Sequence, residues 1–209
     1  MTDVPSTPLD RQAHWDERYT TIGATEVSWY EPAPTMSLDV FDAVGVTARS
    51  SVIDVGGGAS HLVDALLDRG YEDLTVLDVS DAALREARDR IGETTAVSWI
   101  QSDLLHWQPR RTWQVWHDRA VFHFLTDPAD RAIYRDLLHA AVEPGGVIVV
   151  ATFDADGPEW CSGLPVRRYE AAGLAAELGP DLAVLTSGGT VHRTPSGGVQ
   201  PFTWVALRR

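Results

Sequence analysis

The fold of this chain is decided by the stretch Ser51-Val52-Ile53-Asp54-Val55-Gly56-Gly57-Gly58-Ala59-Ser60. A short apolar run ends at Asp54, three glycines follow, and apolar residues then recur at helical spacing over 61–69. A buried strand that turns through glycine into a helix is the first unit of a nucleotide-binding α/β sheet. Glycine is needed in this turn because the backbone bends tightly and a ligand approaches where a Cβ would collide.

A second marker lies at the end of the next predicted strand, 74–78, which reads LTVLD. Its terminal acid, Asp78, follows the glycine turn by about twenty residues, where an acid can accept hydrogen bonds from both ribose hydroxyls of an adenosyl ligand. Capping of the next helix is the alternative role for Asp78, but Ser80 and Asp81 already supply caps. The two markers together predict an adenosyl cofactor.

The spacing of the glycines narrows the choice of cofactor. A dinucleotide fingerprint needs a third glycine or alanine where this chain has His61, which is too large for close helix–strand packing. A phosphate-binding P-loop needs a lysine, and the chain contains none. What remains, Asp54-x-Gly56-x-Gly58-x-Ser60, resembles motif I of the class I S-adenosylmethionine (SAM) methyltransferases, with Ser60 where that motif often has a further glycine. Taken alone, the motif also fits an α/β turn without such a ligand.

This resemblance implies a set of cofactor contacts. The glycine turn would position the methionine part of SAM, Asp54 its amino end and Asp78 its ribose. Asp103, after the third strand, resembles the acid that accepts a hydrogen bond from the adenine amino group, although a solvated turn acid is the alternative. The full set of predicted cofactor residues is Asp54, Gly56, Gly57, Gly58, Asp78, Val79, Ser102, Asp103, Leu104, Asp118, Arg119, Trp15, Tyr19 and Trp29. S-adenosylhomocysteine (SAH) is the expected product, and no metal site is predicted.

The N-terminal segment is rich in aromatic residues. The runs WDERY at 15–19 and SWY at 28–30 resemble the N-terminal cover of one methyltransferase branch. That branch includes lysine methyltransferases acting on translation elongation factors and bacterial relatives of unassigned substrate. We therefore expect one methyltransferase domain, 1–209, in which a cover segment, 1–34, closes over a SAM-binding core, 35–209. Packing of these aromatic rings onto the sheet edge is the alternative.

The rest of the chain alternates helices and strands. Helices are expected at about 9–19, 35–44, 61–69, 80–91, 127–142 and 169–178. Further strands are expected at about 97–101, 113–117, 147–153, 182–193 with a break at Gly188-Gly189, and 200–207, with 154–166 as a loop. This order predicts a single-domain, Rossmann-like, doubly wound α/β sheet of about seven strands, mostly parallel, with a C-terminal antiparallel hairpin.

A protonated acceptor would need a base near the methyl donor. In this fold, the loop after the fourth strand lies at the carboxyl ends of the strands, where ligands bind. His117, Asp118 and His123 belong to this region and are the predicted catalytic residues, with His192 of the final hairpin as a further candidate. Ordinary packing is the alternative for each histidine.

The charge balance limits the partners. The chain has 17 basic and 30 acidic side chains, a net charge of −13, which disfavours nucleic acid and anionic membranes as partners. Cys161 is the single cysteine, which excludes an intramolecular disulfide and a cysteine-cluster metal site. No apolar run reaches membrane-spanning length and the N-terminus does not resemble a secretion signal, so we expect a cytoplasmic protein.

The expected reaction is SAM-dependent methyl transfer to a nitrogen, oxygen or sulfur atom of a small molecule. Methylation of a protein lysine and a non-catalytic SAM-binding regulatory module are the alternatives. After the fourth strand the chain reads Asp118-Arg119-Ala120, unlike the Asp-Lys-Gly-x-Asp-like run of the lysine-methylating relatives and closer to the Asp-Arg-Gly of thiopurine-type enzymes. The expected walls of the acceptor pocket are aromatic and comprise Trp29, Tyr30, Phe122, His123 and Trp160.

Overall fold

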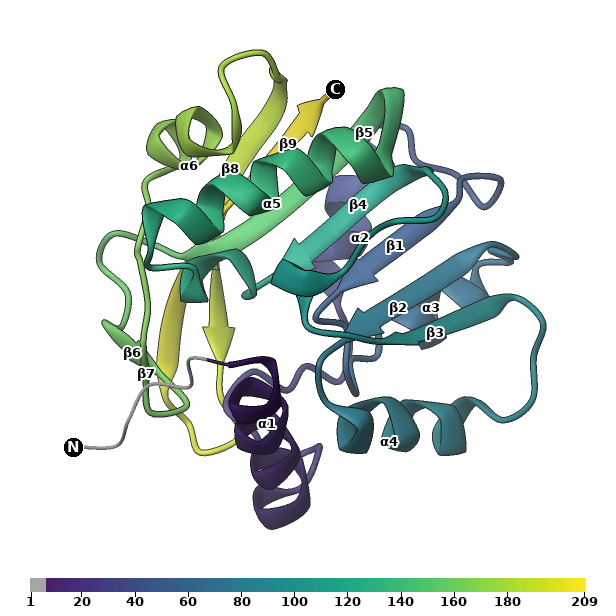
Figure 1. Ribbon diagram of the computed structural model, residues 1–209, viewed down its shortest axis with the longest axis vertical. Helices are drawn as coiled ribbons and strands as arrows, with labels where there is room; N and C mark the ends of the chain where they lie inside the picture. Colours follow the sequence, from purple (N-terminus) through teal and green to yellow (C-terminus); the bar gives the residue numbers. More distant parts are fainter. Residues whose placement is uncertain (1–6) are drawn as a thin grey trace.

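A seven-stranded sheet runs through the computed structural model, which describes residues 7–209 (Figure 1). The strand order is β3-β2-β1-β4-β5-β9-β8, in which β1 to β5 are parallel and β9 is antiparallel to both of its neighbours. The strands are β1 (Val52–Val55), β2 (Leu74–Asp78), β3 (Val97–Gln101), β4 (Trp113–Arg119), β5 (Val142–Phe153), β8 (Ala183–Arg193) and β9 (Val199–Arg208). The predicted fold class is therefore confirmed, including the C-terminal antiparallel hairpin.

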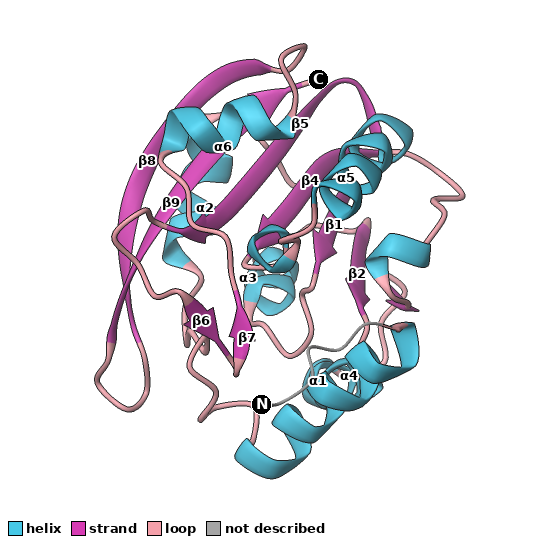
Figure 2. Cartoon of the chain, turned by 60° about the vertical axis from the view of Figure 1, so that its left-hand side comes forward, coloured by secondary structure: helices cyan, strands magenta, loops and turns pink. Residues whose placement is uncertain are grey.

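Helices cover both faces of the sheet (Figure 2). They are α1 (Pro8–Ile22), α2 (Thr35–Ala43), α3 (Leu62–Asp68), α4 (Asp81–Ile91), α5 (Pro128–Ala141) and α6 (Ala171–Leu178), with short 3₁₀ turns η1 (Leu104–His106) and η2 (Phe122–Phe124). The expected start signals operate, because the side chains of Ser80 and Asp127 accept hydrogen bonds from the first turns of α4 and α5. Pro128 occupies the first turn of α5, where its missing N–H costs nothing.

Two apolar cores lie on opposite faces of the sheet. One joins α2, α3 and α4 to the strands through residues such as Phe41, Leu66 and Leu84. The other joins α5 and α6 to the opposite face, with Tyr134 and Leu174 fully buried there. Strands β1 and β2 and the 147–153 part of β5 are buried along their whole length, and their sequences are accordingly largely apolar.

The C-terminal part differs from the sequence prediction in two places. Strand β8 pairs with β9 through Gly188 and Gly189, so the expected break there is wrong, and the irregularity lies between Val184 and Thr186. Gly188 faces the Trp204 ring, where an added Cβ would come within 2.6 Å of a ring carbon, so this glycine marks a close approach of a side chain. The expected loop at 154–166 contains a small hairpin, β6 (Trp160–Cys161) and β7 (Leu164–Pro165).

Helix α1 lies beside α4 at the edge where the parallel strands end (Figures 1 and 2). A capping box between Thr7 and Asp10 starts this helix. Asp16 accepts hydrogen bonds from the Ser80 hydroxyl at 2.7 Å and the Ala82 amide at 3.0 Å, and so adds a carboxylate to the positive N-terminus of α4. No residue of α1 is buried, so polar contacts carry much of its attachment.

Across the described part of the chain, no helix combines the length and apolar character that crossing a membrane requires.

Candidate functional site

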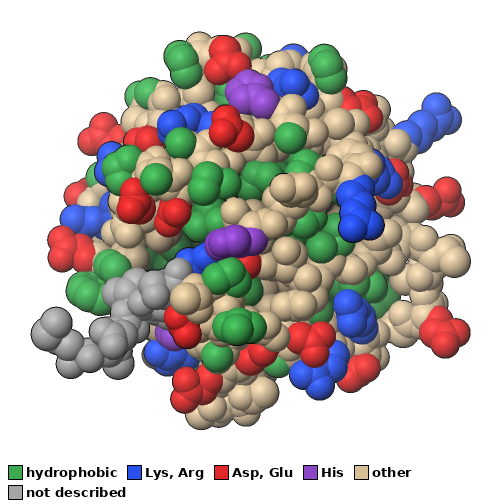
Figure 3. All heavy atoms as spheres, in the orientation of Figure 1, with side chains coloured by type: hydrophobic (Ala, Val, Ile, Leu, Met, Phe, Trp, Pro, Cys, Tyr) green, Lys and Arg blue, Asp and Glu red, His purple; other side chains and the backbone are tan. Residues whose placement is uncertain are grey.

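Two cavities open at the carboxyl edge of the sheet, and they share four lining residues. The first is lined by Arg11, Trp15, Tyr19, Trp29, Val55, Gly56, Leu77, Asp78, Val79, Ser102, Asp103, Leu104, Leu105, Arg119, Ala120, Val121, Phe124, Leu125 and Cys161. The second includes Tyr30, Glu31, Ser37, Asp54, Gly57 and His117 in its lining. Tyr19, Trp29, Gly56 and Arg119 line both, so the two spaces meet at the glycine turn. In Figure 3, hydrophobic side chains show in the middle of the face from which Figure 1 is drawn, with charged side chains around them.

The glycine turn has no room for side chains. Gly56 adopts a φ of +67° and Gly58 a φ of +44°, both in the region that favours glycine. A Cβ at Gly57 would lie 2.5 Å from a carboxylate oxygen of Asp54. A Cβ at Gly58 would lie 2.9 Å from a carboxylate oxygen of Asp78, and Gly58 itself lines neither cavity. The turn therefore brings the two predicted acids close to the backbone between β1 and α3.

Asp78 ends β2 and lines the first cavity. One carboxylate oxygen accepts a hydrogen bond from the Ser80 amide at 2.8 Å. Burial raises the pKa of this carboxyl to about 7, and the negative charges of Asp54 and Asp16 contribute to this rise. Hydrogen bonds from the amides of Ser80 and Val79 lower this pKa in part. A buried carboxylate with unused acceptor capacity is the group that two ribose hydroxyls would stabilise.

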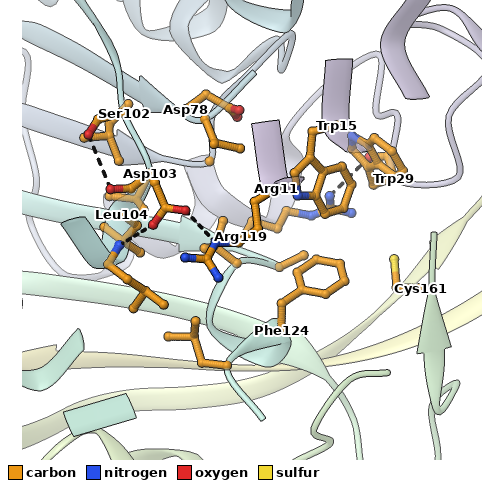
Figure 4. A pocket seen from close by; sticks show the side chains of 18 of the residues that line it. Arg11, Trp15, Trp29, Asp78, Ser102, Asp103, Leu104, Arg119, Phe124 and Cys161 are labelled. Atoms are coloured by element: carbon orange, nitrogen blue, oxygen red, sulfur yellow. Dashed lines mark hydrogen bonds and ion pairs between the residues drawn. The ribbon is translucent and has the colours of Figure 1, made fainter. Parts of the chain in front are cut away.

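Asp103 follows β3 at the same end of the first cavity, beside Ser102 and Leu104 (Figure 4), and Val79 also lines this cavity. Arg11 of α1 donates from Nε to one oxygen of Asp103 at 2.5 Å, and the Leu105 amide donates to the other oxygen at 2.9 Å. Burial raises the pKa of Asp103, but the hydrogen bonds from Arg11 and His106 outweigh it and hold that pKa below its ordinary value. Asp103 is thus an ionised acceptor at the position that the resemblance assigns to adenine.

Comparisons with known proteins agree with this geometry. A family model described as "Methyltransferase domain" matches residues 52–146, which contain β1 to β4 and the glycine turn. The solved structure of a SAM-dependent methyltransferase from Anabaena variabilis superposes with a TM-score of 0.74 at 15% identity, over 99% of this chain and 97% of that one. The chain therefore contains a methyltransferase domain over residues 52–146, within a fold that it shares with solved SAM-dependent methyltransferases. Its cofactor is SAM, which supplies an activated methyl group on a sulfonium sulfur.

Two curated methyltransferases show lower coverage. The eEF1A lysine and N-terminal methyltransferase of Mus musculus is 23% identical over 141 residues, which are 66% of this chain and 20% of that protein. The trans-aconitate 2-methyltransferase of Rhizobium leguminosarum is 29% identical over 113 residues, which are 54% of this chain and 42% of that protein. The chain thus matches less than half the length of each of these relatives.

The second cavity is lined by several charged side chains. Asp54 contacts Nδ1 of His117 at 2.6 Å, and Nε2 of the same ring contacts the Ser37 hydroxyl at 2.8 Å. Glu31 pairs with Arg119 at 2.8 Å. The carboxylates of Asp54 and Glu31 suit an ammonium group, which the methionine end of SAM carries.

Sequence reasoning missed Glu31 and Ser37 as parts of this cavity. Both come from the N-terminal side of the glycine turn, and no spacing rule connects them to it. Glu31 directly follows the SWY run at 28–30, which was the available signal. Ser37 lies in α2 and carries no signal of its own.

The raised pKa of Asp78 predicts a pH dependence of cofactor binding. The free methyltransferase keeps a proton on Asp78 up to about pH 7, whereas ribose hydroxyls bind best to the ionised carboxylate. The affinity for SAH should therefore fall as the pH falls below 7, by up to about tenfold per pH unit. Calorimetry at a series of pH values measures this slope, and Asp78→Asn, which cannot titrate, should bind weakly without it. A flat profile for the unmodified protein would contradict the prediction.

Two of the three predicted catalytic residues lie away from the cavities. Asp118 is fully buried and accepts hydrogen bonds from the Tyr134 hydroxyl at 2.7 Å and the Val121 amide at 2.8 Å. His123 is fully buried between the rings of Phe124 and Phe153, and burial lowers its pKa to about 3. Neither side chain lines a cavity, which removes both from the candidate bases and Asp118 from the direct cofactor contacts.

His117 is placed differently. It lines the second cavity, but both of its ring nitrogens are engaged, one by Asp54 and one by Ser37. The final candidate, His192, contacts the Ser28 carbonyl at 2.7 Å and Glu31 at 3.4 Å, and lines neither cavity. Both histidines therefore belong to the network of polar contacts that includes Asp54, Ser37 and Glu31.

The aromatic wall of the first cavity differs from the expected set. Trp29 belongs to it, as predicted, whereas Tyr30 lines the second cavity. Phe122 is fully buried and Trp160 is 61% exposed, so neither forms a wall. Instead, Trp15 packs edge-to-face against both Trp29 and Phe124, with ring centroids 5.6 and 5.1 Å apart (Figure 4).

Proposed function

We propose that this methyltransferase transfers the methyl group of SAM to a small-molecule acceptor. The observation that carries the proposal is the first cavity, which continues past Asp78 into a compact space lined by Trp15, Trp29, Phe124 and Cys161. Two of these wall residues, Trp15 and Trp29, come from the N-terminal segment, which therefore covers this space at the carboxyl edge of the sheet. A covered, apolar pocket suits a compact acceptor better than a side chain presented by a folded protein.

The cofactor would lie across both cavities. Adenine and ribose would occupy the end with Asp103 and Asp78, and the methionine part would enter the second cavity near Asp54. The sulfonium would then lie where the cavities meet, at Gly56, Tyr19 and Trp29. Catalysis would rest on orientation of the acceptor and exclusion of water, because the leaving sulfur needs no protonation.

The relatives support two acceptor classes. One is named for trans-aconitate, a small molecule, and the other for lysine and the N-terminus of eEF1A. The sequence after β4 departs from the lysine-methylating run, which favours the small molecule. A protein acceptor and a non-catalytic SAM-binding module are the competing proposals.

The deciding experiment incubates the full chain with methyl-labelled SAM and cell extract divided by a small-pore filter. Label in the filtrate fraction is the expected result. Label carried only by a discrete protein band would replace the small-molecule acceptor with a protein. SAM binding without label transfer to either fraction would favour the regulatory module.

We further propose that residues 1–34 act as a cover over the cofactor, of which residues 1–6 lie outside the described part of the chain. Helix α1 has no buried residue, and single polar contacts such as Arg18 to the Ser162 carbonyl at 2.8 Å attach it. SAH binding should increase hydrogen-exchange protection of residues 15–30, because bound cofactor adds contacts to Trp15, Tyr19 and Trp29. Helix α5 serves as the internal control. High and identical protection of 15–30 with and without SAH would show static packing instead.

A further inference from the structure

Charge is unevenly divided along the first cavity. Its acidic lining residues, Asp78 and Asp103, both lie at the end assigned to adenosine. At the other end, Figure 4 shows Trp15, Trp29, Phe124 and Cys161, and the charged side chain that lines the cavity there is Arg119. Among the described residues, no carboxylate lines this acceptor end. A cavity end without a carboxylate is unusual in a protein with a net charge of −13.

Two guanidinium groups act on the acceptor end. Arg119 is stacked over the Phe202 ring at 4.8 Å, and Glu31 neutralises part of its charge. Arg18 lines neither cavity, but it donates to the carbonyl of Ser162 at 2.8 Å, and Ser162 directly follows the lining residue Cys161 in the β6–β7 hairpin. Burial raises the pKa of the Cys161 thiol, and the charges of Arg119 and Arg18 act against this rise. Of these two arginines, Arg119 lines the cavity itself.

The acceptor end also lacks a group that could remove a proton. No histidine or carboxylate of the described chain lines it. The Cys161 thiol, with a pKa of about 11, stays protonated at neutral pH. Burial raises the pKa of the Tyr19 phenol as well. The nucleophile must therefore be competent without deprotonation by the protein.

We infer that the acceptor is an organic carboxylate with an apolar body, which Arg18 and Arg119 attract and which leaves as a methyl ester. A carboxylate is ionised at neutral pH, since its ordinary pKa is about 4. A carboxylate oxygen forms the new bond to the methyl carbon, while the carbon–sulfur bond breaks and its electron pair stays on sulfur. The negative and positive charges cancel, and no proton is released. An ammonium acceptor would instead meet two arginines and would need a base.

This inference rests on the proposed function, and one measurement separates the two. The full chain is incubated with methyl-labelled SAM and the small-molecule filtrate of a cell extract, and the labelled product is then treated with mild alkali. Methyl esters release their label as volatile methanol, which is the expected result. Label that stays non-volatile overturns the carboxylate inference but leaves methyl transfer intact. Absence of label in the filtrate fraction, with SAM still bound, overturns the small-molecule function itself.

Arginine variants test how the carboxylate is attracted. Arg18→Gln keeps a donor for the Ser162 carbonyl but removes the charge, so the labelling rate at limiting filtrate should fall about tenfold and recover at high filtrate concentration. Arg18→Lys should restore most of the rate, and SAH affinity should stay unchanged in both variants. Arg49→Gln, an exposed arginine before the amino end of β1, is the matched control. Equal labelling by Arg18→Gln and the unmodified protein would overturn the role of Arg18.

Discussion

Replacing Asp78 with alanine is expected to weaken SAM and SAH binding by at least about a hundredfold. Asp78 is buried at the end of β2 and faces the cavity next to the glycine turn. Two ribose hydrogen bonds to a charged acceptor would be lost, each worth about 1.5–3 kcal/mol. Together they correspond to roughly a factor of 10² to 10⁴ in affinity. Titration calorimetry with SAH measures the loss directly.

The same strand offers a matched control. Asp73 precedes β2 at its amino end, where it forms an exposed ion pair with Arg111 at 2.6 Å. Asp73→Ala removes a carboxylate from the same region of sequence but from the opposite edge of the sheet, so it should leave SAH affinity unchanged. Equal affinities of Asp78→Ala and Asp73→Ala would remove Asp78 from the ribose site.

The parts of the site that could be predicted are those fixed by local chain geometry. The glycine turn follows a buried strand directly, so its position at the carboxyl edge comes from the order strand, glycine, helix. Asp78 and Asp103 end neighbouring parallel strands, and such ends meet at one edge of a sheet. Register alone therefore placed Asp54, Asp78 and Asp103 at one edge of the sheet, where they line two adjoining cavities.

The candidate bases show where this reasoning stops. Asp118 lies in the polar run that ends β4 and His123 follows the strand, but the sequence does not reveal which way each side chain turns. Asp118 turns toward the Tyr134 hydroxyl of α5, and His123 turns into the packing around Phe153. The first outcome depends on where α5 packs and the second on where Phe153 of β5 lies, and no local pattern encodes either position.

Long-range polar contacts were likewise outside the reach of sequence. Arg11 meets Asp103 and Asp16 meets Ser80 because α1 lies across the carboxyl edge beside α4. The aromatic runs correctly suggested that this segment contributes walls to the site, as Trp15, Tyr19 and Trp29 do. They did not show that an arginine of the same helix would pair with the acid assigned to adenine.

The second large effect is expected for Gly56→Ala. A Cβ at this position would lie 2.0 Å from a methyl carbon of Val121, and the φ of +67° disfavours any residue with a side chain. The steric overlap and the backbone strain together should lower the free energy of unfolding by about 2–5 kcal/mol. SAH binding should also be lost at temperatures where the variant is folded, because Gly56 lines both cavities where they meet.

Two further variants divide this effect into its causes. Gly45 has a φ of +77° and no atom within 4 Å of an added Cβ, so Gly45→Ala reports backbone strain alone, about 1–2 kcal/mol, with SAH binding intact.

In the double variant Gly56→Ala/Val121→Ala, the overlapping methyl carbon is gone, and the Cβ that remains at position 121 lies at an ordinary 3.5 Å. The double variant should therefore be more stable than the sum of the two single changes predicts, which thermal and denaturant unfolding can measure. Strict additivity would show that Val121 does not confine the turn, and unchanged SAH affinity in Gly56→Ala would show that the cofactor does not pass over this glycine.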